Sequence, residues 1–334
     1  MKSRTTILFI LFTAAVAVLF AADIAVGSVS IPIRDVWAAL TGGECDPTTA
    51  RIIRDIRLMK AVVALVAGAA LAVSGLQMQT LFRNPLAGPY VLGVSSGASL
   101  GVALFILGAP MLGLTGHAWL SSLGVAGAAW IGAAATLALV AAISTRIKDI
   151  MVILILGIMI SSGVSAIVQI LQYLSAEEAL KSFVVWTMGS LGDVTATQLA
   201  LLLPAVAAGA ALSVAAIKSL NMLLLGENYA RSMGLDLRRS RSIILLSTTL
   251  LAGTVTAFCG PIGFIGLAMP HVARVIFRNA DHRTLMPAAA LTGAASLLLC
   301  DMVAKLLALP VNSITALLGI PVVVWVVVRN RNIV

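Results

Sequence analysis

Charged residues are scarce in this chain of 334 residues, of which only 10% are Asp, Glu, Lys or Arg. A soluble domain carries about 25% charge, and 60% of these residues are hydrophobic. The composition therefore excludes an ordinary soluble protein and predicts a polytopic membrane protein. The net charge of +9 is attributed to basic cytoplasmic loops, and we expect no nucleic-acid partner.

Cysteines and catalytic motifs are scarce as well. Cys45, Cys259 and Cys300 are odd in number and scattered, which indicates neither a disulfide framework nor a metal site. The sequence contains no G-x-x-x-x-G-K-[ST] phosphate loop and no Gly-Lys dipeptide. We therefore expect no metal, no cofactor and no enzymatic activity in this chain. ATP hydrolysis, if it drives the protein, is expected on a partner subunit.

Long apolar segments recur along the whole chain. Because about 20 apolar residues cross a bilayer as a helix, the hydropathy predicts an all-α fold with about ten transmembrane helices in a single domain, residues 1–334. Thr5–Ala22 is too long for a signal peptide and is interpreted as a retained span. The predicted spans are residues 5–24, 60–81, 93–109, 118–143, 150–173, 196–217, 241–259, 261–277, 285–308 and 312–328.

The positions of Lys and Arg predict the orientation. With the N-terminus inside, 15 of the 22 basic residues lie on the cytoplasmic side, which places both termini in the cytoplasm. The seven outer basic residues include four within Arg51–Lys60 and also Lys305. Asp301 lies four residues before Lys305, in register to pair with it on a helix.

Residues 83–101 hold two prolines, four glycines and three serines within an apolar chain. Such an irregular backbone cannot face lipid, so it is either an ordinary tight loop before a packed span or a loop and half-helix that flank a transport pathway. Ser95 or Ser96 is expected to cap the helix. Glycines recur every four residues and would allow another helix to approach closely. They are Gly93, Gly97 and Gly101.

Two further patterns suggest interaction surfaces. Four polar residues of the fifth span are spaced three, four and three apart, so they share one helix face and either line a pathway or bond neighbouring helices. They are Ser162, Ser165, Gln169 and Gln172. Residues 219–240 form a polar segment with exposed apolar side chains, which is either a solvated loop or a short helix that docks into a soluble partner.

A weak internal repeat is visible. Residues 66–75 resemble residues 251–260, and Phe-Arg-Asn recurs at Phe82 and Phe277. The copies lie five spans apart, so they would run in opposite directions as inverted-repeat halves. Chance similarity in an Ala- and Gly-rich chain is the alternative.

Four segments, at residues 83–101, 220–239, 260–274 and 310–329, resemble the motifs of the FecCD family of ABC-importer permeases in the family's order. These permeases pass cobalamin, haem and ferric siderophores. The resemblance implies inverted halves and a homodimer in the bacterial inner membrane. It also implies two ATPase subunits, a periplasmic or lipid-anchored substrate-binding protein, surrounding membrane lipid and alternating access.

The resemblance also implies site residues. ATPase coupling would involve Leu225, Gly226, Glu227, Ala230, Arg231 and Gly234. The four polar residues of the fifth span would border the translocation path, Asn84 and Leu86 would form a cytoplasmic gate, and Arg57, Lys60 and Lys305 would dock the binding protein.

Two alternatives stay open on the sequence. An ion-coupled secondary transporter would need carboxylates in the membrane, and Asp301 is the clear candidate. Among cargoes, a ferric siderophore is expected first, and haem and cobalamin remain open.

Overall fold

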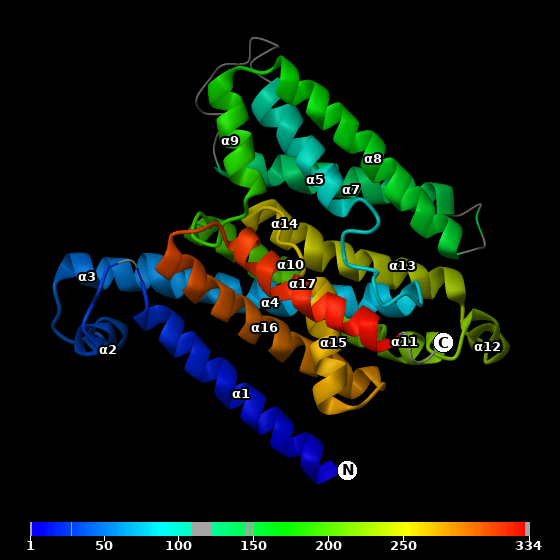
Figure 1. The fold of residues 1–334 in the computed structure, drawn as a ribbon, viewed down its shortest axis with the longest axis horizontal. Coiled ribbons are helices and arrows are strands. Elements are labelled where there is room, and N and C mark those ends of the chain that lie inside the picture. The colour runs from blue at the N-terminus through cyan, green and yellow to red at the C-terminus, as the bar shows by residue number, and fades with distance from the viewer. Residues whose placement is uncertain (1, 28, 109–121, 145–146, 148–149, 331–334) are drawn as a thin grey trace. The chain divides into compact units, whose positions relative to one another are not determined.

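A computed structural model of the chain describes residues 2–27, 29–108, 122–144, 147 and 150–330. Within these ranges every regular element is a helix (Figure 1). The elements are α1 (Lys2–Ala25), α2 (Ile33–Thr41), α3 (Pro47–Arg51), η1 (Ile52–Leu58), α4 (Met59–Leu81), α5 (Val94–Ala103), η2 (Leu104–Gly108), α7 (Ser122–Ser144), α8 (Ile150–Leu174), α9 (Glu177–Thr187), α10 (Ala196–Ala215), α11 (Ile217–Leu223), α12 (Glu227–Ser232), α13 (Leu237–Thr248), η4 (Thr249–Gly253), α14 (Thr254–Cys259), α15 (Ile265–Phe277), α16 (His282–Leu307) and α17 (Val311–Asn330).

The helices agree with the predicted spans. In the part of the chain that the structure describes, six helices are long and apolar enough to cross a membrane, and four shorter apolar helices cover 94–108, 124–140, 265–277 and 311–326. Each coincides with one of the ten predicted segments, so the all-α polytopic fold is confirmed. Residues 109 and 118–121 of two predicted spans lie outside the described residues.

The second span is the clearest difference from the prediction. It was expected to begin at residue 60, but the helix runs without a break from Pro47 through α3 and η1 to Leu81. Asp46 caps its first turn by accepting a hydrogen bond from the Thr49 amide at 2.9 Å. Arg54 donates to the Ala39 carbonyl at 2.5 Å, and Arg57 donates to carbonyls at the end of α1. The helix therefore continues through these charged residues.

The chain forms two compact units. Unit 1 comprises Met1–Val73, Ser190–Leu203 and Gly263–Val334. Within it α1 and α15 both pack on α16 (Figure 1). A Cβ atom added at Gly68 would overlap the Gly293 carbonyl, and one at Gly293 would overlap the Gly68 carbonyl. The backbones of α4 and α16 are therefore in direct contact, as small residues permit.

Unit 2 comprises Ser74–Gly189 and Pro204–Ile262. Its α5 and α7 pack backbone to backbone, because a Cβ at Gly97 or Gly132 would overlap the opposite helix. The predicted close approach is confirmed. The predicted serine cap is wrong, since α5 is preceded by Gly93, whose φ of 80° lies in the left-handed region that glycine favours, with no side-chain cap.

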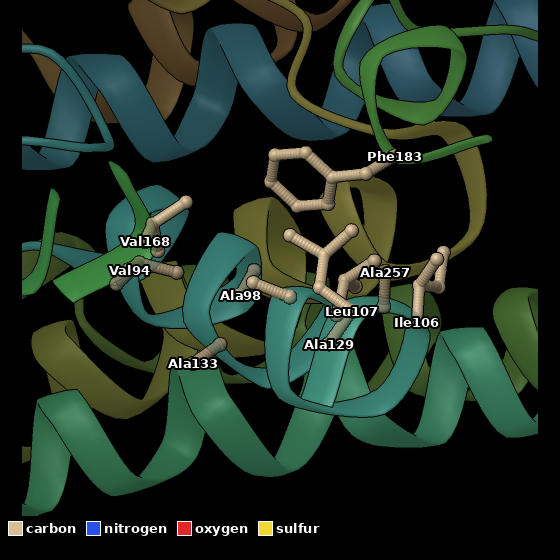
Figure 2. Packing of buried hydrophobic residues seen from close by; sticks show 11 residues of the cluster. Val94, Ala98, Ile106, Leu107, Ala129, Ala133, Val168, Phe183 and Ala257 are labelled. Carbon is tan, nitrogen blue, oxygen red and sulfur yellow. The ribbon is translucent and has the colours of Figure 1, made fainter. Parts of the chain in front are cut away.

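An apolar core joins α5, η2, α7, α8, α9 and α14 of unit 2. Figure 2 shows Phe183 of α9 directed toward Leu107 of η2, with Ala98 and Ala129 beneath them. Small alanines leave room for the aromatic ring at this level of the core.

The interior of unit 2 also holds a polar cluster. Gln77 donates to Ser213 and Ser247 and accepts from Thr248 at 3.1 Å, and all four side chains are buried. Both serines donate in turn to the carbonyl of Gly209. The cluster bonds α4, α10 and α13 together, which is a common way to join helices in lipid.

The repeated Phe-Arg-Asn has the same local structure in both copies. Each phenylalanine is buried and each following arginine is exposed, and the helix ends at Leu81 in the first copy and at Phe277 in the second. The φ angles are 47° at Arg83 and 48° at Arg278, both in the left-handed region. The shared geometry supports a true internal repeat.

Candidate functional site

The predicted polar stripe of α8 borders a groove in unit 2. One cavity of about 630 Å³ is lined by Ser162, Ser165 and Gln169 together with Ser95 and Ser96 of α5. A second, of about 270 Å³, shares several of these residues and adds Gln172, Ser99 and Thr187. The described residues that line the two cavities carry no formal charge. The structure thus brings all four stripe residues onto a surface on which hydroxyl and amide groups alternate with apolar side chains such as Val91, Ile158 and Phe183.

Tyr90 also lines the larger cavity. Its hydroxyl donates to the Ile262 carbonyl at 3.0 Å and accepts from Thr256 at 3.4 Å. Burial raises the pKa of Tyr90 to about 12, so the phenol stays neutral at physiological pH. The cavity lining therefore remains uncharged.

The predicted gate residues share one turn between α4 and α5. The Asn84 side-chain oxygen accepts a hydrogen bond from the Leu86 amide at 2.9 Å, as in an Asx turn. This bond fixes a turn in which the Leu86 side chain is 47% exposed. The structure brings the two residues together, and their gating role stays a prediction.

The predicted coupling segment consists of two very short helices, α11 and α12, before α13. Gly226 and Gly234 flank α12 with φ angles of 103° and 84°, which only glycine adopts readily. A Cβ at Gly234 would meet nothing within 4 Å. Leu225 is 60% exposed, and Arg231 is also exposed, so the segment presents both apolar and basic groups.

Two other predicted coupling residues are not on that surface. Ala230 is fully buried. Glu227 is half-buried and forms an ion pair with Arg241 of α13 at 2.6 Å. Tyr229 of α12 and Met233, which follows that helix, are exposed instead. The exposure of Met233 was predicted from the sequence, whereas Tyr229 was missed.

Arg57, predicted to dock a binding protein, is buried. Its guanidinium donates to the carbonyls of Ile24 and Ala25 at 3.1 and 2.7 Å and to that of Val29 at 2.5 Å. The contacts with Ile24 and Ala25 satisfy free carbonyls at the C-terminal end of α1, where a cation is favourable. The geometry supports a structural role for Arg57.

Lys60 and Lys305 belong to one ion-pair network in unit 1. Asp301 lies 3.0 Å from Lys60 and 2.7 Å from Lys305, which confirms the pairing predicted from the four-residue spacing. Lys305 also pairs with Asp23 at 2.8 Å, and both aspartates are fully buried. Asp23 was missed in the sequence because it stands alone at the end of an apolar span. Lys60 is the more exposed lysine, and docking stays a prediction.

The serines of α5 were also missed as individual pathway residues. Ser95, Ser96 and Ser99 lie at positions i, i+1 and i+4 of one helix, so a polar face could have been predicted from the spacing.

Among the described residues, no cluster of three or more His, Cys, Asp or Glu side chains could hold a metal ion.

The chain is similar to known transport proteins along almost its whole length. A model of the FecCD transport family matches residues 14–329. The hemin transport system permease protein HmuU of Yersinia pestis is 37% identical, over 91% of this chain and 90% of that protein. The vitamin B12 import system permease protein BtuC of Shigella boydii is 35% identical, over 88% and 89%. A solved structure described as an inward-facing metal-chelate type ABC transporter matches with a TM-score of 0.84 and 31% identity, over 97% of this chain and 99% of that one.

Proposed function

Because this chain belongs to the FecCD transport family of ABC-transporter permeases, we propose that it is the membrane subunit of a binding-protein-dependent importer. The observation that carries the proposal is the family match over residues 14–329, supported by the polytopic helical fold. In this proposal two copies assemble with two ATPase subunits, and a substrate-binding protein delivers the cargo from outside. Both termini lie in the cytoplasm.

The groove between α5 and α8 is proposed to border the translocation path. Hydroxyl and amide groups can form hydrogen bonds with the polar groups of a large solute, and they carry no fixed charge that would retain it. Only about 11% of the apolar window of α8 is buried within the chain, so this helix has ample surface for a second copy and for the path between the two.

The exposed surface of residues 219–240 is proposed to transmit ATPase movement. Leu225, Tyr229 and Met233 offer apolar contacts beside Arg231, as expected of a short helix seated in a groove of a soluble partner. The turn of Asn84 and Leu86 is proposed to seal the inner end of the path, where an exposed leucine from each copy would exclude water.

The proposed cargo is an iron chelate, first a ferric siderophore, with haem and cobalamin as the competing choices. The uncharged lining suits large chelates whose charge is internally compensated. Purified permease, ATPase and binding protein should be reconstituted in vesicles and offered labelled ferric siderophore, haemin, cobalamin and molybdate. Accumulation of a chelate or cobalamin supports the proposal, and accumulation of molybdate alone would refute the cargo class.

Assembly is tested separately from cargo. Co-expression with candidate ATPase subunits from the same organism should yield a complex with equal numbers of permease and ATPase chains by native mass spectrometry. A permease that never retains an ATPase, yet transports in response to a proton or sodium gradient, would favour the ion-coupled alternative.

A further inference from the structure

A second groove of unit 2 lies away from the polar path and has not been assigned a role. It has a volume of about 550 Å³, within the range of small-molecule sites. Its lining divides into an apolar group and a smaller polar group. The apolar residues are Leu81, Phe82, Leu137, Ala142, Ile147, Ile150, Ile153, Leu237, Leu245 and Leu246, and the polar residues are Arg231, Arg238, Arg241 and Ser242.

The lining changes from basic to apolar along one face of α13. From Arg238 onward the groove residues of α13 are spaced three, one, three and one apart, and Leu237 directly precedes them, which keeps them on one side of a helix. The basic residues come first, at Arg238 and Arg241, and Leu245 and Leu246 follow. With a rise of 1.5 Å per residue, the stripe from Arg238 to Leu246 is about 12 Å long. A ligand that matches it has an anionic end and an apolar body.

The basic end keeps an excess of positive charge. Glu227 pairs with Arg241 at 2.6 Å, and the Asp236 carboxylate accepts the Arg239 amide at the start of α13. Arg231 and Arg238 are exposed, and no ion pair with a carboxylate of the described residues is found for either. Two guanidinium groups are therefore available to an anion, which they bind in a planar, bidentate manner.

The apolar end is continuous with the interior of the unit. Leu81 and Phe82 are each 1% exposed and Ile153 is 3% exposed, yet all three reach the groove. Arg238 stands in the first turn of the apolar helix Leu237–Cys259, which is long enough to cross a membrane. Its charge therefore lies near a membrane surface, and the Lys and Arg distribution predicts that this is the cytoplasmic one.

We propose that this groove binds an anionic phospholipid of the cytoplasmic leaflet, with the phosphate between Arg231 and Arg238 and an acyl chain along Leu245 and Leu246. The charge, the order of the lining and the position at a helix end agree with the basic pockets between membrane helices that bind anionic headgroups. Since α12 lies directly beside the phosphate end, the bound lipid would buttress the segment proposed to contact the ATPase.

The test uses photo-crosslinking in vesicles. The full-length permease is reconstituted in phosphatidylethanolamine vesicles that contain a trace of phosphatidylglycerol or phosphatidylcholine with a diazirine in one acyl chain. After illumination, mass spectrometry locates the labelled peptides. We expect phosphatidylglycerol to label the peptides of Leu245–Leu246 and Ile150–Ile153 more strongly than phosphatidylcholine does.

Two variants and a control separate a site from general lipid contact. Arg238→Gln should lower the phosphatidylglycerol labelling of these peptides about fivefold, the effect of one basic residue near an anionic surface. Arg239→Gln removes the same charge from the adjacent exposed position, which does not line the groove, and should leave labelling unchanged. Ser242→Trp fills the groove at an exposed position and should lower labelling by either lipid.

Three results would overturn the proposal. Equal labelling by both lipids would mean ordinary lipid contact without headgroup recognition. Equal effects of Arg238→Gln and Arg239→Gln would mean general attraction to the basic surface. No labelling in the isolated permease, together with crosslinks from these peptides to a second copy of the chain, would show that protein covers the groove.

Discussion

Replacement of Lys305 by methionine should destabilise unit 1 more than any change to an exposed lysine. Its ammonium lies 2.8 Å from Asp23 Oδ1, 2.7 Å from Asp301 Oδ2 and 3.1 Å from the Asp23 carbonyl. The two contacts with Asp23 are hydrogen bonds, and the contact with Asp301 is an ion pair. Methionine keeps most of the length of the side chain but leaves two fully buried carboxylates with Lys60 alone.

Loss of one partner from a buried ion pair costs about 3–5 kcal/mol, because the other charge stays buried without compensation. We expect Lys305→Met to lower the free energy of unfolding by about this amount. The double variant with Asp23→Asn keeps the Lys60–Asp301 pair and should lose less than the sum of the single changes. The recovered coupling energy should be about 1–3 kcal/mol.

The free energies would be measured by titrating the purified protein with sodium dodecyl sulfate in mixed micelles and following helicity by circular dichroism. Lys181→Met in α9 is the matched control, because Lys181 is exposed, and it should change stability by less than about 0.5 kcal/mol. Additive effects of Lys305→Met and Asp23→Asn, or a loss no larger than that of the control, would refute the network as a source of stability.

Three further predictions concern packing, the path and coupling. Gly132→Ala should destabilise the protein by about 1–3 kcal/mol, because its Cβ meets the backbone of α5, whereas Gly127→Ala on the same helix meets nothing within 4 Å and should be neutral or stabilising in the same titration. After replacement of the native cysteines, a cysteine at Ser165 should react with a membrane-impermeant thiol reagent in one transport state while one at Ile167 should not; equal protection would make the α8 stripe a helix contact. Gly234→Arg should leave the fold intact but prevent co-purification of the ATPase, whereas Gly234→Asn, which tolerates the left-handed conformation, should keep it. An intact complex with the arginine variant would exclude this segment as the contact.

The helices were predictable because a helix that crosses a lipid bilayer needs about 20 mostly apolar residues, and the ten apolar segments can be recognised by this property. The start of the second span was not predictable in the same way. Arg54 and Arg57 look like loop residues until the carbonyls of Ala39 and α1 are placed beside them. Long-range partners decide whether such charges interrupt a helix.

The site was predictable only where residues lie on one helix. The α8 stripe could be read from its spacing, and so could the Asp301–Lys305 pair. The role of Asp23 could not be predicted, because its partner Lys305 is distant in sequence. The burial of Ala230 could not be predicted either, because it depends on how the short helices fold. The serine cap failed because Gly93 already supplies the left-handed turn before α5.

Uptake in vesicles tests the central claim most directly. Permease and ATPase would be reconstituted in vesicles whose interior corresponds to the cytoplasm and contains ATP. Labelled ferric siderophore and the binding protein would be added outside. We predict accumulation that requires ATP and persists when ionophores collapse the proton and sodium gradients. Accumulation that persists without ATP or ATPase and disappears with the ionophores would contradict it.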